Sequence, residues 1–380
     1  MHSNQNKLYN PMKFSFIAFA FLLCFNISVS AQDGHRKHFT IPDIEGFHTL
    51  KGDFHIHTVF SDGLVWPNLR VLEAWKEGLD VISITDHIEY QPFKEDVKGD
   101  HNRAFEVANA KADELGILLI RGSEITRKMP PGHSNALFTT DNNLLDTPKW
   151  EDAFTEAKKQ GAFIFWNHPG WKAQQPDSMV WFPEHTLLQT EGKMHGIEIV
   201  NYKEYYPGAF QWALDKKLTI IGNSDIHGSI FQEYDISAGE HRPITLVFTR
   251  ERSIKGVKDA LFDGRTAVFY NGTIYGREEW VSKLYKACIG VEPDVAAASE
   301  KSRSIYITNY SSIDLNLTPG KEAEKHGMIY PLELPAHSTI RLTARAAKAQ
   351  EILKPSQQFE FSVDNMLVGP EKPLKVNFKF

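Results

Sequence analysis

Nine histidine and carboxylate side chains recur along the sequence, each at or near the end of a segment with the composition of a β-strand. They are His55, His57, Asp62, His87, Glu124, His133, His168, Asp225 and His227. Imidazole nitrogens and carboxylate oxygens suit zinc, manganese or iron, and the lack of cysteine among them excludes a structural zinc site built on thiolates. Because such groups are costly to bury unless they are paired or bind a metal, the repeated pattern predicts a metal site.

The strand-like segments explain how these distant residues could meet. Side chains alternate between the two faces of a strand, so His55 and His57 should point to the same side. The carboxyl ends of parallel strands form one edge, and the loops at that edge carry the chemistry. Four later apolar segments each lead to a candidate ligand: residues 80–85 precede His87, 116–120 precede Glu124, 162–166 precede His168 and 218–222 precede Asp225.

Clustered divalent ions lower the pKa of a bridging water and hold phosphate oxygens, so hydrolysis of a phosphate ester is the leading interpretation. In it, a metal-bridging hydroxide attacks phosphorus. Arg127 and Lys203 are candidate phosphate ligands because their donors can pair with phosphate oxygens, although each could also be a solvated loop charge. Asp86, beside His87, could fix the tautomer of a ligand imidazole or merely accept a hydrogen bond in a turn.

These segments resemble the motifs of the PHP family, the polymerase and histidinol phosphatase domain superfamily, in the family's order. The matching segments are His55-Ile56-His57, Ser61-Asp62-Gly63, Thr85-Asp86-His87, Gly122-Ser123-Glu124, His133-Ser134-Asn135, Asn167-His168-Pro169 and Ser224-Asp225-Ile226-His227. The resemblance covers roughly positions 50 to 275, and no ligand position is vacant. It implies an α/β fold, a distorted (β/α)7 PHP barrel, with three divalent metal ions (Zn, Mn or Fe) at the carboxyl ends of the strands.

The resemblance also implies how the ligands divide among the three ions. His55, His57, Glu124 and Asp225 would hold the first ion, Glu124 would bridge to a second ion held by His133 and His168, and Asp62, His87 and His227 would hold the third. We expect four of these residues to act in catalysis, namely Glu124, Asp225, His227 and His57.

The N-terminal segment is predicted to be a signal peptide over residues 1–31. Lys13 precedes an apolar run over 14–27, and Val29 and Ala31 occupy the expected cleavage positions. The run is too short to make a good membrane span. Cys24 allows a lipoprotein alternative, although the residues before it are not the small ones that lipidation favours. We therefore expect a periplasmic or secreted protein with no membrane span after cleavage.

Composition is compatible with two domains and disfavours a nucleic-acid polymer as partner. The chain has 380 residues, 42% of them hydrophobic, enough for a substantial barrel and a smaller unit. After cleavage only Cys288 remains, so no intramolecular disulfide can form. The net charge of -6 offers no basic field for nucleic acid, although small nucleotides stay possible substrates.

The expected organisation has four parts: the signal peptide (1–31), an N-terminal segment (32–49), the PHP metallo-phosphoesterase barrel (50–290) and a C-terminal β-rich domain (300–380). In the last part, short alternating segments separated by Pro, Gly and Asn predict a small β-sandwich. Since it carries no cluster of candidate ligands, a packing role is favoured over carbohydrate binding.

Aromatic residues between the motifs bear on the substrate. Trp171 and Tyr202 are candidate substrate contacts. The aromatic residues could form a ring of side chains around the metal site, an aromatic collar, or they could pack in the core. The set comprises Trp166, Trp171, Trp181, Phe182, Tyr202, Tyr205 and Tyr206. Together with export, a collar favours a phosphodiesterase that resembles the secreted PHP enzymes acting on small organophosphate diesters.

Three alternatives stay open. A phosphomonoesterase of the histidinol-phosphatase type would use the same metals but should place more Arg or Lys around a dianionic phosphate. A non-enzymatic periplasmic metal-binding module would bind metal without turning over any ester. An amidohydrolase-like C–N hydrolase usually carries a carboxylated lysine, which is not evident in this sequence.

The mature protein is expected to begin at Gln32, because Val29 and Ala31 fit the cleavage pattern. N-terminal sequencing of protein from the periplasmic fraction checks this expectation. An acylated N-terminus at Cys24 would instead establish the lipoprotein alternative.

Overall fold

The computed structural model describes residues 35–380. The signal peptide expected over 1–31 and its cleavage site before Gln32 lie outside the described residues. Within residues 35–380, no helix combines the length and the apolar character needed to cross a membrane.

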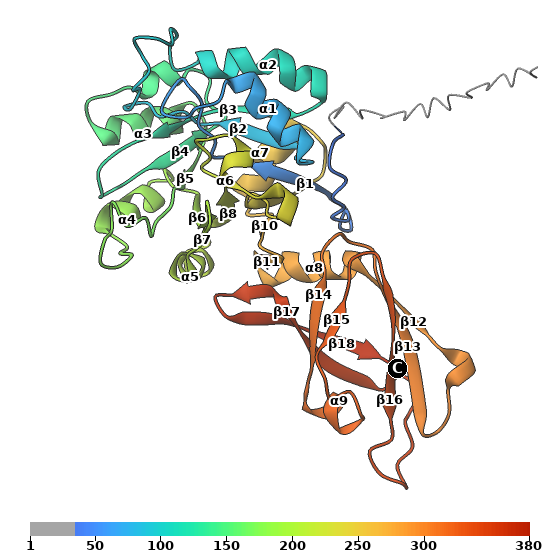
Figure 1. The fold of residues 1–380 in the computed structure, drawn as a ribbon. Coiled ribbons are helices and arrows are strands. Elements are labelled where there is room, and N and C mark those ends of the chain that lie inside the picture. The colour runs from blue at the N-terminus through green and yellow to red at the C-terminus, as the bar shows by residue number, and fades with distance from the viewer. Residues whose placement is uncertain (1–34) are drawn as a thin grey trace, which may run out of the picture. The chain divides into compact units, whose positions relative to one another are not determined.

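The N-terminal domain is α/β, built on a mixed sheet with helices between its strands (Figure 1). Its strands are β1 (His48–Asp53), β2 (Val81–Ile84), β3 (Leu118–Ile125), β4 (Ser134–Leu137), β5 (Phe163–Trp166), β6 (Gly196–Asn201), β7 (Glu204–Tyr205), β8 (Thr219–Asn223), β9 (Ile244–Thr249), β10 (Thr266–Tyr270) and β11 (Thr273–Gly276). β1, β2 and β3 are parallel neighbours, and so are β5, β6 and β8. β4 joins these two groups and runs antiparallel to both β3 and β5.

The central strands are buried along their whole length, as expected for strands with both faces covered. All residues of β2, β5 and β8 are buried. The helices of this domain are α1 (Pro67–Lys76), α2 (Arg103–Leu115), α3 (Trp150–Lys159), α4 (Pro183–Thr190), α5 (Pro207–Asp215), α6 (Ile230–Glu233), α7 (Ile254–Phe262) and α8 (Glu278–Cys288). α2 ends at Gly116, whose φ of 68° is a left-handed conformation that glycine adopts without strain.

The barrel closes where the segments after β1 and β8 meet. The amide of Asp225 donates to the carbonyl of His55 at 2.9 Å, and the amide of His57 donates to the carbonyl of Ile226 at 3.1 Å. Further from this rim, β9 pairs antiparallel with β1 and contacts β8 through a side chain: Thr245 Oγ1 donates to the Gly222 carbonyl at 2.8 Å. β9 also pairs antiparallel with β10, so the sheet departs from a regular parallel barrel at this point.

A buried ion-pair network lies beneath this closure. Arg242 is 1% exposed and donates to Asp53 Oδ2 at 2.9 Å and to Glu77. Asp53 also accepts from the hydroxyl and the amide of Ser224, at 2.5 and 3.1 Å. Since Asp53 ends β1 and Ser224 follows β8, the network joins the two strand ends that lead to the first and last candidate ligands.

The C-terminal domain is a two-sheet, all-β sandwich, which confirms the expected fold class. β12 (Ile289–Pro293), β13 (Ser302–Asn309) and β16 (Thr339–Arg345) form one sheet. β14 (Leu315–Pro319), β15 (Leu332–Leu334), β17 (Gln358–Gly369) and β18 (Lys372–Lys379) pair with one another, and the short helix α9 (Lys321–Lys325) follows β14. Inward-facing residues such as Ile305, Leu317 and Phe361 are fully buried.

Replacing Arg242 with alanine should lower the free energy of unfolding by about 3–5 kcal/mol, because it leaves the carboxylates of Asp53 and Glu77 buried without their cation. Chemical denaturation followed by circular dichroism measures this change. As a control, Arg252→Ala removes an exposed guanidinium that lies 3.9 Å from Asp43 and should change stability by less than about 0.5 kcal/mol. Equal changes in the free energy of unfolding for the two substitutions would show that the buried network does not contribute more to stability than a surface ion pair.

Candidate metal centre

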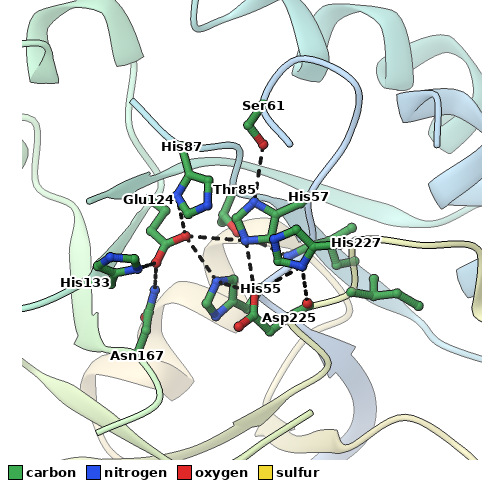
Figure 2. Close-up of polar contacts among 12 residues, drawn as sticks. His55, His57, Ser61, Thr85, His87, Glu124, His133, Asn167, Asp225 and His227 are labelled. Atoms are coloured by element: carbon green, nitrogen blue, oxygen red, sulfur yellow. Dashed lines mark hydrogen bonds and ion pairs between the residues drawn. The ribbon is translucent and has the colours of Figure 1, made fainter. Parts of the chain in front are cut away.

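The structure brings all nine candidate ligands to the rim of the barrel. Figure 2 shows how most of them, with Glu124 at the centre, converge from several strands; the ligands labelled there are His55, His57, His87, Glu124, His133, Asp225 and His227. His55, His57 and Asp62 follow β1, His87 follows β2, Glu124 lies in β3, His133 precedes β4, His168 follows β5, and Asp225 and His227 follow β8.

His133 reaches the rim by a different route from the other ligands. It precedes a strand, whereas the others follow one or lie near its end. Because β4 is antiparallel to β3 and β5, its start lies beside their carboxyl ends. His133 Nδ1 thereby comes to 2.9 Å from Glu124 Oε1.

Glu124 lies at the centre of the cluster, fully buried, with its two oxygens facing different imidazoles. Oε1 lies 2.9 Å from His133 Nδ1 and 3.7 Å from His168 Nε2. Oε2 lies 3.4 Å from His55 Nε2 and 3.3 Å from His57 Nε2. One carboxylate can therefore contribute an oxygen to each of two neighbouring ions.

Two aspartates also face imidazoles of the cluster. Asp225 Oδ1 lies 3.1 Å from His55 Nε2 and 3.0 Å from His57 Nε2. Asp62 Oδ1 lies 3.2 Å from His227 Nε2 and 3.5 Å from His87 Nε2. A Cβ at Gly63 would lie 2.6 Å from the backbone of His57, so glycine lets this turn fold closely against it.

Among the described residues, three groups have donor atoms that all lie within 4.8 Å of one another. These groups are His57, Asp62, His87 and His227; His55, His57 and Asp225; and His87, Glu124 and His133. His57 and His87 each belong to two groups, and His168 to none, so the division differs in part from the one the resemblance implies.

The donor set fits divalent cations. His57 Nε2, His133 Nδ1 and Asp62 Oδ1 are buried polar atoms without a hydrogen bond of acceptable geometry, although carboxylates or imidazoles lie close by. Polar atoms buried in this way are expected to have partners. Ions coordinated by these nitrogen and oxygen atoms would supply them.

Electrostatics also favour positive charge at the centre. Burial acts to raise the pKa of Glu124, but the imidazoles of His87 and His133 hold it well below its ordinary value. Burial acts to lower the pKa of His87, but Glu124 and Asp62 raise it to about 10. By contrast, burial and two neighbouring imidazoles lower the pKa of His57 to about 3. The carboxylates thus produce a negative field that metal ions would neutralise.

Glu198 is the main residue of the site that the sequence did not indicate. It is a fully buried carboxylate in β6. Its Oε1 accepts from His55 Nδ1 at 2.9 Å and from Asn223 Nδ2 at 2.9 Å. Its Oε2 accepts from the amide of His168 at 2.7 Å. Glu198 therefore fixes the ring of His55 so that Nε2 faces the centre. The feature of the sequence that could have identified it is a carboxylate inside the otherwise apolar run Gly196–Val200.

Asp86 proves to be a turn acceptor. It accepts from the amide and the hydroxyl of Thr58, at 2.6 and 2.7 Å, and from Ser61 Oγ at 2.7 Å. Ser61 Oγ in turn lies 3.3 Å from His57 Nδ1. Asp86 thus also orients the imidazole of His57 through Ser61, and its side-chain hydrogen bonds among the described residues include none to His87.

A pocket of about 400 Å³ opens beside the candidate ligands. Apart from those ligands, its lining consists of Trp171, Asn201, Tyr202, Glu204, Tyr206 and Glu233. Three residues at this site adopt a left-handed backbone that is unusual outside glycine: His168 (φ 28°), Tyr202 (φ 52°) and Asp225 (φ 51°). Such conformations cost free energy and cluster at functional sites.

The expected aromatic collar is present only in part. The residues of the set that line the pocket are Trp171, Tyr202 and Tyr206. Trp166 is fully buried, because it ends β5 with its side chain in the core, where it stacks on His185 at 3.7 Å between ring centroids. The other rings pack away from the pocket: Trp181 against Trp166, Tyr205 against Tyr275 and Phe182 against His185.

The two candidate phosphate ligands do not line the pocket. Arg127 Nε lies 2.7 Å from Glu89 Oε1, and the guanidinium also donates to the carbonyl of Thr147 at 2.6 Å. Lys203 Nζ lies 3.1 Å from Glu240 Oε2. Both cations are thus paired with carboxylates outside the pocket lining.

Comparison with known proteins covers both domains. An Ig-like domain model matches residues 289–379. A search of curated proteins finds no match to the chain. Among solved structures, the chain is similar to a two-domain protein from Bacteroides vulgatus that contains a predicted PHP-like metal-dependent phosphoesterase, with 46% identity and a TM-score of 0.85 over 91% of this chain and 99% of that chain.

Two further structures are more distant. They are a metal-dependent phosphoesterase from Bifidobacterium adolescentis (18% identity, TM-score 0.37, 47% of this chain and 87% of that one) and an amidohydrolase from Chromobacterium violaceum (14% identity, TM-score 0.36, 47% of this chain and 88% of that one). Neither likeness is close enough to support a conclusion. The match to the Bacteroides protein, in contrast, extends over both domains and confirms the PHP resemblance, and the chain therefore belongs to the family of two-domain PHP-like metal-dependent phosphoesterases.

Proposed function

We propose that this protein hydrolyses small phosphodiesters at a centre of three divalent metal ions. The observation that carries the proposal is the pairing of a dense nitrogen and oxygen donor set with a pocket whose lining holds no Lys or Arg within residues 35–380. Metal ions would then be the main source of positive charge for the phosphate.

The position of Glu124 supports an assignment of ligands to three ions. Its Oε2 and the carboxylate of Asp225 both face His55 and His57, which would hold a first ion. Its Oε1 faces His133 and His168, which would hold a second ion. A third ion would be held by Asp62, His87 and His227.

When bound, such ions would supply hydroxide near neutral pH and neutralise charge on phosphate oxygens. The side chains Glu124, Asp225, His57 and His227 would act by fixing the positions at which this chemistry occurs. In the reaction, a bond forms between the hydroxide oxygen and phosphorus, and the bond from phosphorus to one ester oxygen breaks. The electron pair leaves with that oxygen, which takes up a proton from solvent, so the products are a phosphomonoester and an alcohol.

The composition of the pocket supports a diester over a monoester. A phosphodiester carries one negative charge, whereas a monoester approaches two near neutral pH. The pocket lining adds the carboxylates of Glu204 and Glu233 to those of the candidate ligands. A dianion would therefore lack cationic side chains and would lie near additional negative charge. The size of the pocket also supports a small molecule over a nucleic-acid polymer.

Replacing Glu124 with glutamine should reduce both metal content and turnover, the latter by at least about 100-fold, or about 2.7 kcal/mol. The reason is that the amide removes the charge shared between two ions. Metal analysis of purified protein and hydrolysis of bis(p-nitrophenyl) phosphate provide the two measurements. Three ions per chain are expected in the wild-type protein and two in His227→Ala, which removes a ligand of the third ion only.

A surface carboxylate provides the control for this series. Glu95 is exposed and lies 3.9 Å from Lys98, so Glu95→Gln should retain wild-type metal content and turnover. A folded Glu124→Gln protein with wild-type stoichiometry would refute the bridging role of Glu124. Unchanged stoichiometry in His227→Ala would refute the assignment of the third ion.

The metal-loaded enzyme should hydrolyse bis(p-nitrophenyl) phosphate with a kcat/KM at least about tenfold higher than that for p-nitrophenyl phosphate, a difference of about 1.4 kcal/mol. Steady-state release of p-nitrophenolate measures both substrates under the same conditions. An equal or reversed preference would favour a phosphomonoesterase, and metal binding without turnover of any ester would favour a metal-binding module.

A further inference from the structure

We infer that the pocket beside the metal centre binds a cationic substituent, so that the substrates are phosphodiesters of amino alcohols, above all those with a quaternary ammonium. This inference rests on the proposed phosphodiesterase function. It assigns Glu204 and the rings of Trp171, Tyr202 and Tyr206 to substrate specificity.

The charges around the pocket support a cationic ligand. Glu204 and Glu233 both line it. Neither belongs to the groups of converging metal donors found in the described part of the chain, so they are not needed as further ligands. Glu204 is exposed and accepts from Tyr206 OH at 2.7 Å. Glu233 Oε1 accepts from the amides of His227, at 3.2 Å, and Gly228.

Among residues 35–380, no lysine or arginine forms an ion pair with Glu204, whereas Glu233 interacts electrostatically with Arg70. Lys203 follows Tyr202 in the chain, and its Nζ lies 5.9 Å from the centroid of the Tyr202 ring and 5.2 Å from that of Tyr234, but it pairs with Glu240. It therefore lines a neighbouring pocket. Arg127 pairs with Glu89. The charge on Glu204 is thus left to be balanced by solvent or by a ligand.

The aromatic lining favours an ammonium group over other cations. Trp171 and Tyr202 are 43% and 38% exposed, so both rings are accessible to a ligand. The face of an aromatic ring attracts cations, and rings combined with a carboxylate are a common way to bind quaternary ammonium groups. A hydrated metal ion would gain less from such a lining, because it prefers oxygen ligands.

The ring of Tyr206 and the backbone of Tyr202 are held in place before a ligand arrives. A Cβ at Gly170 would lie 2.6 Å from the Tyr206 ring, so glycine at this position is what allows the ring to approach the loop that carries His168. The amide of Tyr202 donates to the carbonyl of Asn223 at 3.1 Å, which fixes its left-handed backbone. Little conformational entropy would be lost on binding, which favours affinity.

A zwitterionic diester would fit both the metal centre and the aromatic part of the pocket. Its monoanionic phosphate would lie at the metal centre, and its ammonium would lie among the rings beside Glu204. A neutral aryl or alkyl group in the same place would leave the carboxylate of Glu204 beside an apolar surface, which is unfavourable. The cation should therefore strengthen substrate binding.

Two esters with the same leaving group test this inference: p-nitrophenyl phosphocholine and p-nitrophenyl 3,3-dimethylbutyl phosphate. They differ only in a quaternary nitrogen that replaces a carbon, so shape and leaving-group chemistry are matched. We expect kcat/KM for the choline ester to be at least about tenfold higher, or about 1.4 kcal/mol. The difference should lie mainly in KM, since the ammonium contact is made equally in the ground and transition states.

Glu204→Gln should reduce this preference several-fold while leaving metal content unchanged. The control is Glu191→Gln, which removes the same charge from a surface ion pair, 2.7 Å from Lys193, and should keep the full preference. Equal kcat/KM for the two esters in the wild-type enzyme would overturn the inference but leave the phosphodiesterase proposal intact. Hydrolysis of neither ester nor of bis(p-nitrophenyl) phosphate would overturn both, and a full preference in Glu204→Gln would exclude Glu204 as the ammonium partner.

Discussion

The buried carboxylate of Glu124 is the constraint on which the rest of the centre depends. A carboxylate with no exposure to solvent must be surrounded by positive or hydrogen-bonding groups, and here imidazoles from four neighbouring segments surround it. Those imidazoles can reach it only if the carboxyl ends of β1, β2 and β5 and the start of β4 lie at one height around the barrel. The burial of Glu124 therefore constrains both the arrangement of the strands and the charges at the centre.

Supporting groups beneath the rim keep this arrangement in place. Glu198 orients His55 and receives the amide of His168, so one carboxylate positions ligands from two strands. Asp53 and Arg242 join the ends of β1 and β8 in a similar way. Both carboxylates are fully buried and lie directly below the ligands. Substitutions in this layer would act on the metal centre without touching a metal.

Much of the centre could be predicted from the sequence, because its residues follow apolar runs that are recognisable as strands. His87, His168 and Asp225 all follow such runs, and the sheet places them together. The direction of β4 could not be predicted in this way, since the short segment after His133 carries no signal of its orientation. Glu198 was missed because a single carboxylate in a strand does not reveal which strand lies beside it.

The aromatic residues illustrate a second limit of the sequence. Trp166 and Trp171 lie close together in the chain, yet one is in the core and the other lines the pocket. Which side a ring takes depends on strand alternation and loop path, and composition does not encode either. For the same reason the sequence could not show that Arg127 and Lys203 are paired with Glu89 and Glu240 away from the pocket.

The closure of the barrel has a consequence for how the protein opens. At the rim, β1 and β8 are joined by backbone hydrogen bonds between the segments of His55–His57 and Asp225–Ile226, while lower down β9 separates the two strands. Ions bound to His55, His57 and Asp225 would cross-link β1 and β8 at this junction. Local opening there would then require release of metal, so amide hydrogen exchange at this junction and metal dissociation would report on the same event.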